Sequence, residues 1–135
     1  DDFRIVKSSV LGDGSYDLKK RGAVPYSVFL NPPFSRVGMG EKEALEAGYK
    51  VKVAKLTAAS IPKAQVLEQP VGLLKAVIDE ETGLILGAHL FCEESYELIN
   101  MIKLAMDAKL HYTVLRDTIY THPTMSEAFN DLFAI

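Results

Sequence analysis

Two apolar segments separated by a short polar turn are the feature that most constrains the fold of this chain. Residues 73–78 and 84–91 are rich in Leu, Ile, Val and Ala, whereas residues 79–83 are mostly acidic and end in glycine. Apolar runs of this length bounded by turn residues indicate strands, and a five-residue connection that contains glycine is typical of a β-hairpin. The sequence therefore predicts an antiparallel pair of strands within the chain.

The remaining periodicities predict further strands and helices. Leu98, Ile99 and Ile102 share one face of a helix over residues 95–109, the clearest helix in the sequence. We also predict strands at 26–30, 34–39 and 51–53, a short helix at 41–47, a turn or two of helix at 115–119 and a last helix at 127–133; residues 58–69 fit neither pattern. Because strands and helices do not alternate regularly and a hairpin is present, we expect an α+β fold, an antiparallel sheet with helices packed on it.

Length and composition limit the organisation of the chain. Its 135 residues are the size of one domain. Residues 1–23 include a Gly-Asp-Gly-Ser sequence and a run of charged side chains, which is typical of a linker, so we place the domain at residues 24–135.

Composition also excludes several classes of partner. A net charge of −3 with scattered lysines argues against a nucleic-acid partner. No apolar stretch approaches the roughly 20 residues that cross a bilayer, so we expect no membrane partner. Cys92 is the only cysteine and cannot form a disulfide within the chain. It gives no support for secretion, so we expect a cytoplasmic protein in which Cys92 is a core residue.

The segment at residues 121–127, Thr-His-Pro-Thr-Met-Ser-Glu, contains the strongest candidate for chemistry. His122 can exchange a proton near neutral pH, and Glu127 can hold its ring, which makes an acid/base pair. The same glutamate fits a capping box with Thr124 at a helix start. Both roles remain open, since a carboxylate has two oxygens. Ser126 or Cys92 could pair with His122 as a nucleophile, but no nucleophile-elbow motif is present.

Other motifs are weaker. Gly38-Met39-Gly40 follows a predicted strand and precedes a helix, as in a dinucleotide-binding loop. Glu43 stands where that loop needs its third glycine, so we interpret Gly40 as a helix N-cap. We assign no chemistry to His89 or His111, and the isolated histidines predict no metal site.

Together, the short motifs of residues 24–135 resemble the two-cysteine flavoprotein disulfide reductases, the group of glutathione reductase, lipoamide dehydrogenase and mercuric reductase. The similarity lies in the order and spacing of Val24-Pro25, Val28-Phe29, Pro33, Ser35-Arg36-Val37-Gly38, Glu41, Ala44, Gly72-Leu73-Leu74-Lys75, Ile85-Leu86-Gly87-Ala88, Glu97-Leu98-Ile99, Thr113, Asp117, His122-Pro123-Thr124 and Ser126-Glu127. The chain resembles the dimerisation domain of this family. Its features are most similar to the bacterial branch related to mercuric reductase and linked to reactive-chlorine resistance.

The resemblance implies a function for this domain within a larger enzyme. FAD and NAD(P)H domains would precede it, and residues 1–23 would lead out of the FAD domain. His122 and Glu127 would act as the acid/base pair at the redox thiols of a partner subunit, with His122, Pro123 and Thr124 facing the partner's flavin. We expect this chain alone to bind neither cofactor and to be inactive, with itself and the missing domains as partners. The alternative is a stand-alone α+β binding module without catalysis.

Three features differ from the family pattern. Gly40 replaces the usual Ser or Thr, residues 92–95 replace a glycine and small residues, and Tyr120 replaces a frequent His. The sequence also predicts a homodimer, because Phe129, Leu132 and Phe133 would form an apolar patch if all three faced water.

Overall fold

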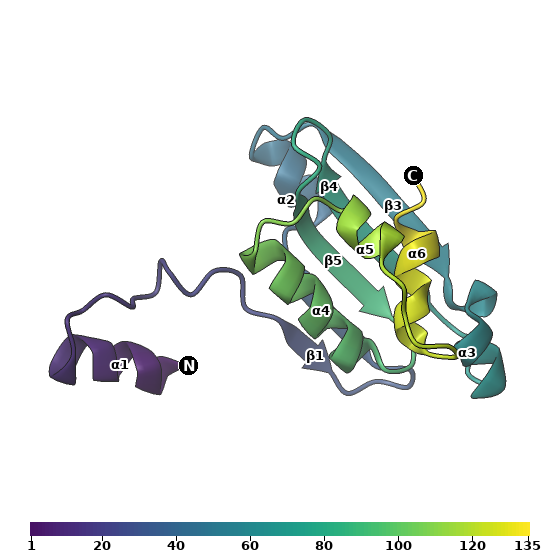
Figure 1. Cartoon of the computed structure of the whole chain (residues 1–135), viewed down its shortest axis with the longest axis horizontal. Coiled ribbons are helices and arrows are strands. Elements are labelled where there is room, and N and C mark those ends of the chain that lie inside the picture. Colours follow the sequence, from purple (N-terminus) through teal and green to yellow (C-terminus); the bar gives the residue numbers. More distant parts are fainter.

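The computed structural model describes all 135 residues, and its centre is a five-stranded sheet in the order β1-β2-β5-β4-β3 (Figure 1). Every neighbouring pair of strands is antiparallel. The strands are β1 (Tyr26–Val28), β2 (Phe34–Gly38), β3 (Val51–Thr57), β4 (Leu73–Asp79) and β5 (Ile85–Phe91). The predicted hairpin is β4–β5, with Leu74 opposite Leu90, and the predicted α+β class is confirmed.

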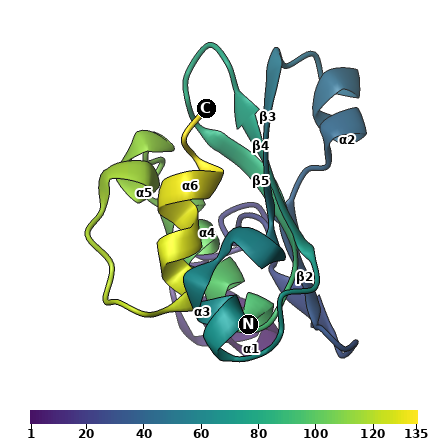
Figure 2. The same ribbon diagram turned by 90° about the vertical axis from the view of Figure 1, so that its right-hand side faces the viewer.

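Helices cover the sheet unequally. They are α1 (Asp2–Leu11), α2 (Glu41–Glu46), α3 (Pro62–Val66), α4 (Ser95–Asp107), α5 (Thr113–Asp117) and α6 (Ala128–Leu132), with single 3₁₀ turns η1 (Ala58–Ser60) and η2 (Met125–Glu127). Figure 2 shows α3, α4, α5 and α6 on one side of the sheet and α2 on the other. Pro62 occupies the first turn of α3, where its missing N–H costs no hydrogen bond, and this explains how a helix forms within residues 58–69 despite a proline.

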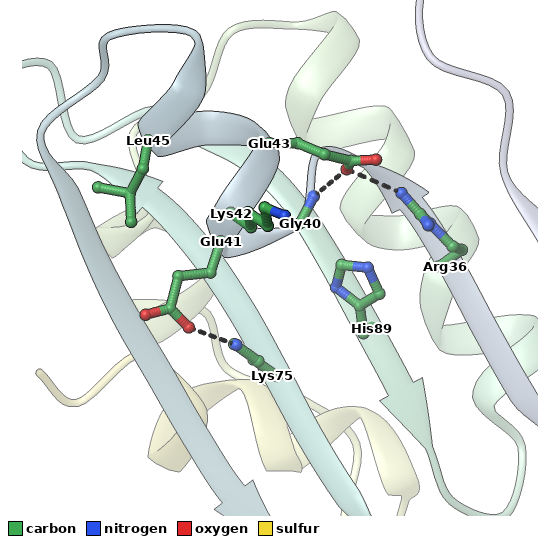
Figure 3. Close-up of a pocket in the computed structure, with 8 residues that line it drawn as sticks. All are labelled: Arg36, Gly40, Glu41, Lys42, Glu43, Leu45, Lys75 and His89. Carbon is green, nitrogen blue, oxygen red and sulfur yellow. Dashed lines mark hydrogen bonds and ion pairs between the residues drawn. The ribbon is translucent and has the colours of Figure 1, made fainter.

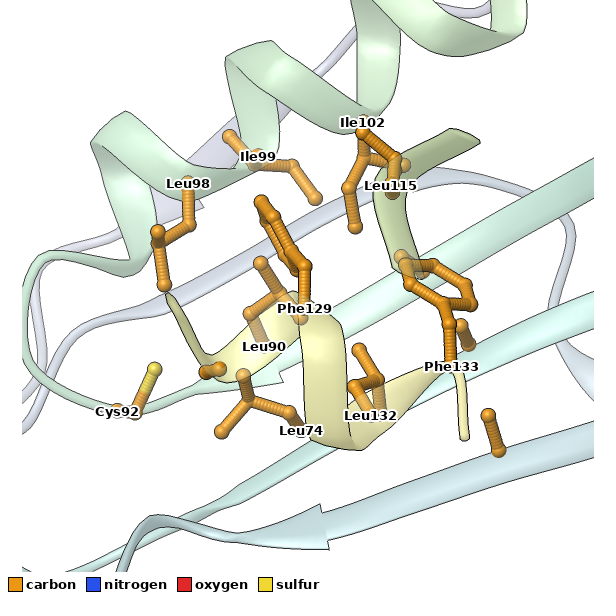
Figure 4. Packing of buried hydrophobic residues seen from close by; sticks show 14 of the residues in the cluster. Leu74, Leu90, Cys92, Leu98, Ile99, Ile102, Leu115, Phe129, Leu132 and Phe133 are labelled. Carbon is orange, nitrogen blue, oxygen red and sulfur yellow. The ribbon is translucent and has the colours of Figure 1, made fainter. Parts of the chain in front are cut away.

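The hydrophobic core lies between the sheet and the side that carries α3, α4, α5 and α6 (Figure 4). Leu74 and Leu90 from the sheet are fully buried, as are Ile102 of α4 and the aromatic rings of Phe129 and Phe133. The prediction that Phe129, Leu132 and Phe133 form an exposed patch is wrong, because none of the three has any exposed surface. Their apolar stripe is covered by the chain's own sheet, so it provides no argument for a dimer.

The N-terminal helix α1 was not predicted. It contains no buried residue, and its apolar side chains Phe3, Val6 and Val10 are all exposed. Figure 1 shows it at a distance from the sheet, joined by an extended segment. No helix of the structure combines the length and the hydropathy needed to span a membrane.

Candidate functional site

The structure brings His122 and Glu127 together. His122 lies in the irregular segment between α5 and η2, and the peptide bond that joins it to Pro123 is cis. Glu127 is the last residue of η2. The Nδ1 atom of His122 is 2.8 Å from Oε1 of Glu127. The histidine side chain is 71% exposed, whereas that of Glu127 is 22% exposed. A mostly sheltered carboxylate therefore holds a ring that faces outward.

Glu127 uses its two oxygens for two different partners. Its Oε2 accepts a hydrogen bond from the backbone N–H of Thr124 at 2.8 Å, which is the capping interaction that the sequence predicted. The Thr124 N–H, and after it the His122 ring, lower the pKa of Glu127, so the carboxylate is ionised at neutral pH. An ionised carboxylate can only accept hydrogen bonds, so His122 must donate its Nδ1–H. The capping and orienting geometries thus coexist.

The other groups of the segment are engaged elsewhere. Pro123 is exposed and Thr124 is half-buried. The Thr124 hydroxyl donates to the carbonyl of Thr121 at 2.7 Å and lies 2.9 Å from the Ser126 hydroxyl. Burial raises the pKa of Cys92 to about 12. Since Ser126 is bonded to Thr124 and Cys92 is a buried thiol, neither is arranged as a nucleophile activated by His122.

Sequence reasoning missed two residues that hold the segment. The side-chain amide of Asn130 donates to the carbonyls of Arg116 and Thr118, at 2.6 and 2.9 Å. The hydroxyl of Tyr120 donates to the carbonyl of Leu115 at 2.8 Å. Neither contact has a local sequence signature, because the partners are 5 to 14 positions apart and the acceptors are backbone carbonyls, which every residue has.

A second cluster of charged groups lines a hollow of about 720 Å³ beside α2, on the sheet face opposite the core (Figure 3). Arg36 pairs with Glu43 at 3.1 Å, and Lys75 pairs with Glu41 at 2.6 Å. His89 lies between the two cations, and its Nδ1 atom is buried without a partner. Burial, followed by the charges of Arg36 and Lys75, lowers the pKa of His89. The ring is therefore neutral at neutral pH, and the two ion pairs attach α2 to the sheet.

The glycines at the end of β2 serve packing instead of phosphate binding. Gly38 has a φ of +69°, and a Cβ there would lie 2.3 Å from the carbonyl oxygen of Leu86. The N–H of Gly40, the N-cap of α2, already donates to the Glu43 carboxylate. A bound phosphate would compete with that carboxylate, so this strand-to-helix junction does not suit a dinucleotide.

These features of fold and site agree with one family. Residues 24–133 match the family described as pyridine nucleotide-disulphide oxidoreductase, dimerisation domain. The chain belongs to this family, and the resemblance predicted from its short motifs is confirmed.

Two named relatives and one solved structure show how close the similarity is. The probable pyridine nucleotide-disulfide oxidoreductase RclA of Escherichia coli (strain K12) is 50% identical over 135 residues, all of this chain and 31% of that protein. A dihydrolipoyl dehydrogenase of Rhizobium etli is 35% identical over 111 residues, 82% of this chain and 23% of that protein. The solved structure of the HOCl-induced flavoprotein disulfide reductase RclA from Escherichia coli has a TM-score of 0.94 at 50% identity, over 99% of this chain and 31% of that one. The chain thus spans less than a third of the length of these relatives.

Proposed function

We propose that this chain acts as the dimerisation domain of a longer flavin-dependent NAD(P)H:disulfide or metal oxidoreductase, and that it supplies His122 and Glu127 to the redox thiols of a partner subunit. The observation that carries the proposal is the 2.8 Å hydrogen bond between an exposed imidazole and a sheltered carboxylate. Family membership over residues 24–133 favours this function over a stand-alone binding module.

The geometry suits proton exchange at Nε2 of His122. Because Nδ1 donates to Glu127, Nε2 is the ring nitrogen left to exchange a proton with a reacting group. In the proposed step, a thiolate attacks a disulfide, the old S–S bond breaks as a new one forms, and the departing sulfur takes the Nε2 proton of the imidazolium. The neutral imidazole that remains returns to the imidazolium when its Nε2 atom takes the proton of an incoming thiol, which becomes a thiolate. Proton delivery assists because a departing thiolate is stabilised when it is protonated.

Glu127 would contribute in two ways. Its negative charge stabilises the imidazolium that exists before the proton leaves, and its bond to Nδ1 fixes the ring orientation. The second oxygen, bonded to the Thr124 N–H, keeps the carboxylate itself in place. A change at Glu127 would therefore affect both His122 and the start of the C-terminal helical segment.

The cofactors of the proposed enzyme would be held outside this chain. FAD supplies the two-electron chemistry that links NAD(P)H to the thiols when it is bound. His122, Pro123 and Thr124 would face the partner's flavin, and two of them, His122 and Pro123, are exposed as such contacts require. Residues 1–23 would connect the FAD domain to the dimerisation domain at 24–135, and the exposed apolar side chains of α1 suit packing against that missing part.

The test is His122→Gln in the full-length enzyme, with stopped-flow separation of the two half-reactions. We expect thiol–disulfide exchange to slow by about a hundred- to ten-thousand-fold, the usual loss for a general acid/base, while flavin reduction by NAD(P)H is unchanged. Glu127→Gln should cost less. His111→Gln, another exposed histidine, is the matched control and should leave both half-reactions intact. An unaltered exchange rate in His122→Gln would exclude the proposed role.

A further inference from the structure

The segment that carries His122 is held in place by side chains. Residues 118–124 lie between α5 and η2 and belong to no helix or strand. Thr118, Ile119 and the residues at 121–123 are exposed, and Ile119 is 98% exposed. An exposed, irregular segment of this kind has many accessible conformations, so the position of His122 depends on its few anchors.

The first anchor is the side-chain amide of Asn130, a half-buried residue of α6. Its nitrogen has two hydrogens and lies within hydrogen-bond distance of two carbonyl oxygens, those of Arg116 at 2.6 Å and Thr118 at 2.9 Å. Only the amide nitrogen, and not the amide oxygen, can donate to two carbonyls, so the orientation of the side chain is determined. Asn130 therefore fixes the point at which the chain leaves α5.

The second anchor is Tyr120. Its hydroxyl donates to the carbonyl of Leu115 at 2.8 Å, and burial raises its pKa to about 12, so the group remains a donor at neutral pH. Its ring meets Phe129 edge-on, with centroids 6.1 Å apart and planes at 64°. Because Phe129 has no exposed surface, the ring rests on a rigid part of the core.

The third anchor is Glu127, which binds Thr124 and His122 at the far end of the segment. Glu127, Phe129 and Asn130 lie within one turn of each other along the C-terminal helical segment. A single short helical stretch thus holds the beginning, the middle and the end of the segment around His122.

We propose that Asn130 and Tyr120 are positioning residues for His122: they act through the backbone of residues 115–120 and touch no reacting atom. This inference rests on the proposed function. Displacement of a reacting group by about 1 Å can cost roughly a hundredfold in rate, so we expect Asn130→Ala to slow thiol–disulfide exchange by about ten- to a hundredfold in the full-length enzyme. Tyr120→Phe keeps the ring and loses one hydrogen bond, so a smaller loss of about fivefold is expected.

Two further variants, Asn130→Asp and Gln65→Ala, test whether the slower exchange comes from the lost hydrogen bonds of Asn130. Asn130→Asp keeps the size of the side chain but cannot donate to two carbonyls, so it should be at least as slow as Asn130→Ala. Gln65 donates its amide to the carbonyl of Ala59 at 2.6 Å, a hydrogen bond that joins α3 to η1 and involves no residue of the segment at 118–124. Gln65→Ala removes the same kind of bond and should leave the exchange rate unchanged.

The decisive measurement is a double variant. If Asn130 acts only through His122, the variant with both His122→Gln and Asn130→Ala should be no slower than His122→Gln alone, because the two changes remove one contribution. If the fold-losses in exchange rate of the two single variants multiplied in the double variant, Asn130 would support the enzyme by another route, and the inference would be overturned.

A second readout does not depend on activity. In this chain, the ¹⁵N shifts of the His122 ring report whether Nδ1 carries the proton, and we expect Asn130→Ala and Tyr120→Phe to reduce the population of that bonded form. Unchanged shifts and an unchanged exchange rate in both variants would overturn the positioning role while leaving the proposed function intact. Conversely, changed shifts with no effect of His122→Gln on exchange would reject the proposed function alone.

Discussion

Truncation of Phe133 to alanine tests whether the C-terminal aromatic residues belong to the core of one chain or to a contact between chains. Phe133 has no exposed surface, and its ring lies 6.1 Å, centroid to centroid, from both Tyr112 and Phe129. Loss of a buried phenylalanine typically lowers the free energy of unfolding by about 3–5 kcal/mol. Aromatic pairs add about 0.5–1.5 kcal/mol each beyond their buried area, so we expect a value near 4 kcal/mol.

The effect should be large in a simple assay. With a urea dependence of about 2 kcal/mol per molar, 4 kcal/mol moves the unfolding midpoint of this chain down by roughly 2 M. It is also a large fraction of the total stability of about 5–15 kcal/mol that a domain commonly has. Phe29→Ala is the matched control, because that side chain is 97% exposed and its truncation should change stability by no more than about 0.5 kcal/mol.

Unfolding should be measured at two protein concentrations that differ tenfold, since self-association makes apparent stability depend on concentration. The core assignment predicts that the loss caused by Phe133→Ala is the same at both concentrations. If Phe133→Ala weakened association but left the unfolding free energy of the monomer unchanged, the reasoning from burial would be refuted, and the sequence-based patch would be correct.

Two further predictions follow from the structure. The pKa of Glu127 is lowered in the folded chain, first by the Thr124 N–H and then by His122, relative to about 4.3 when unfolded. Its stabilisation is therefore fully present above the unfolded pKa and is lost as the pH falls through the folded pKa, so Glu127→Gln should be less stable than the wild type at pH 7 and the difference should shrink towards pH 3 in urea unfolding. Gly38→Ala places a Cβ 2.3 Å from a backbone oxygen at φ +69°, whereas Gly14→Ala meets nothing within 4 Å at φ +68°. Thermal unfolding should show a loss near the left-handed penalty of about 1–2 kcal/mol for Gly14→Ala and a clearly larger one for Gly38→Ala; equal losses would contradict the close contact.

Local patterns in the sequence were sufficient for most of the secondary structure. The hairpin β4–β5 and the helices α4 and α2 lie where apolar period and turn chemistry placed them, and α5 begins two residues earlier than predicted. These signals act between residues a few positions apart. The sequence also identified His122 and Glu127 as neighbours, since both belong to one short segment and one helix start. The family followed from the order of many short motifs along residues 24–133.

Only the tertiary structure decided what each apolar face contacts. The stripe of Phe129, Leu132 and Phe133 shows that one side of the last helix must be covered, but the period alone does not distinguish the chain's own sheet from a second chain. The tertiary structure also decided between the two contacts that the spacing of Glu127 permits. One carboxylate oxygen binds the His122 ring and the other accepts from the Thr124 N–H, so both contacts are present.

The anchors of the His122 segment were beyond the reach of the sequence for a related reason. Asn130 and Tyr120 bind backbone carbonyls, and every residue has a carbonyl, so no residue type identifies the partner. Which carbonyl lies within reach depends on how α5, α6 and the sheet pack together. The sequence therefore determined most of the elements and predicted that His122 and Glu127 form a pair, while packing determined what buries the C-terminal aromatic residues and what holds the histidine in place.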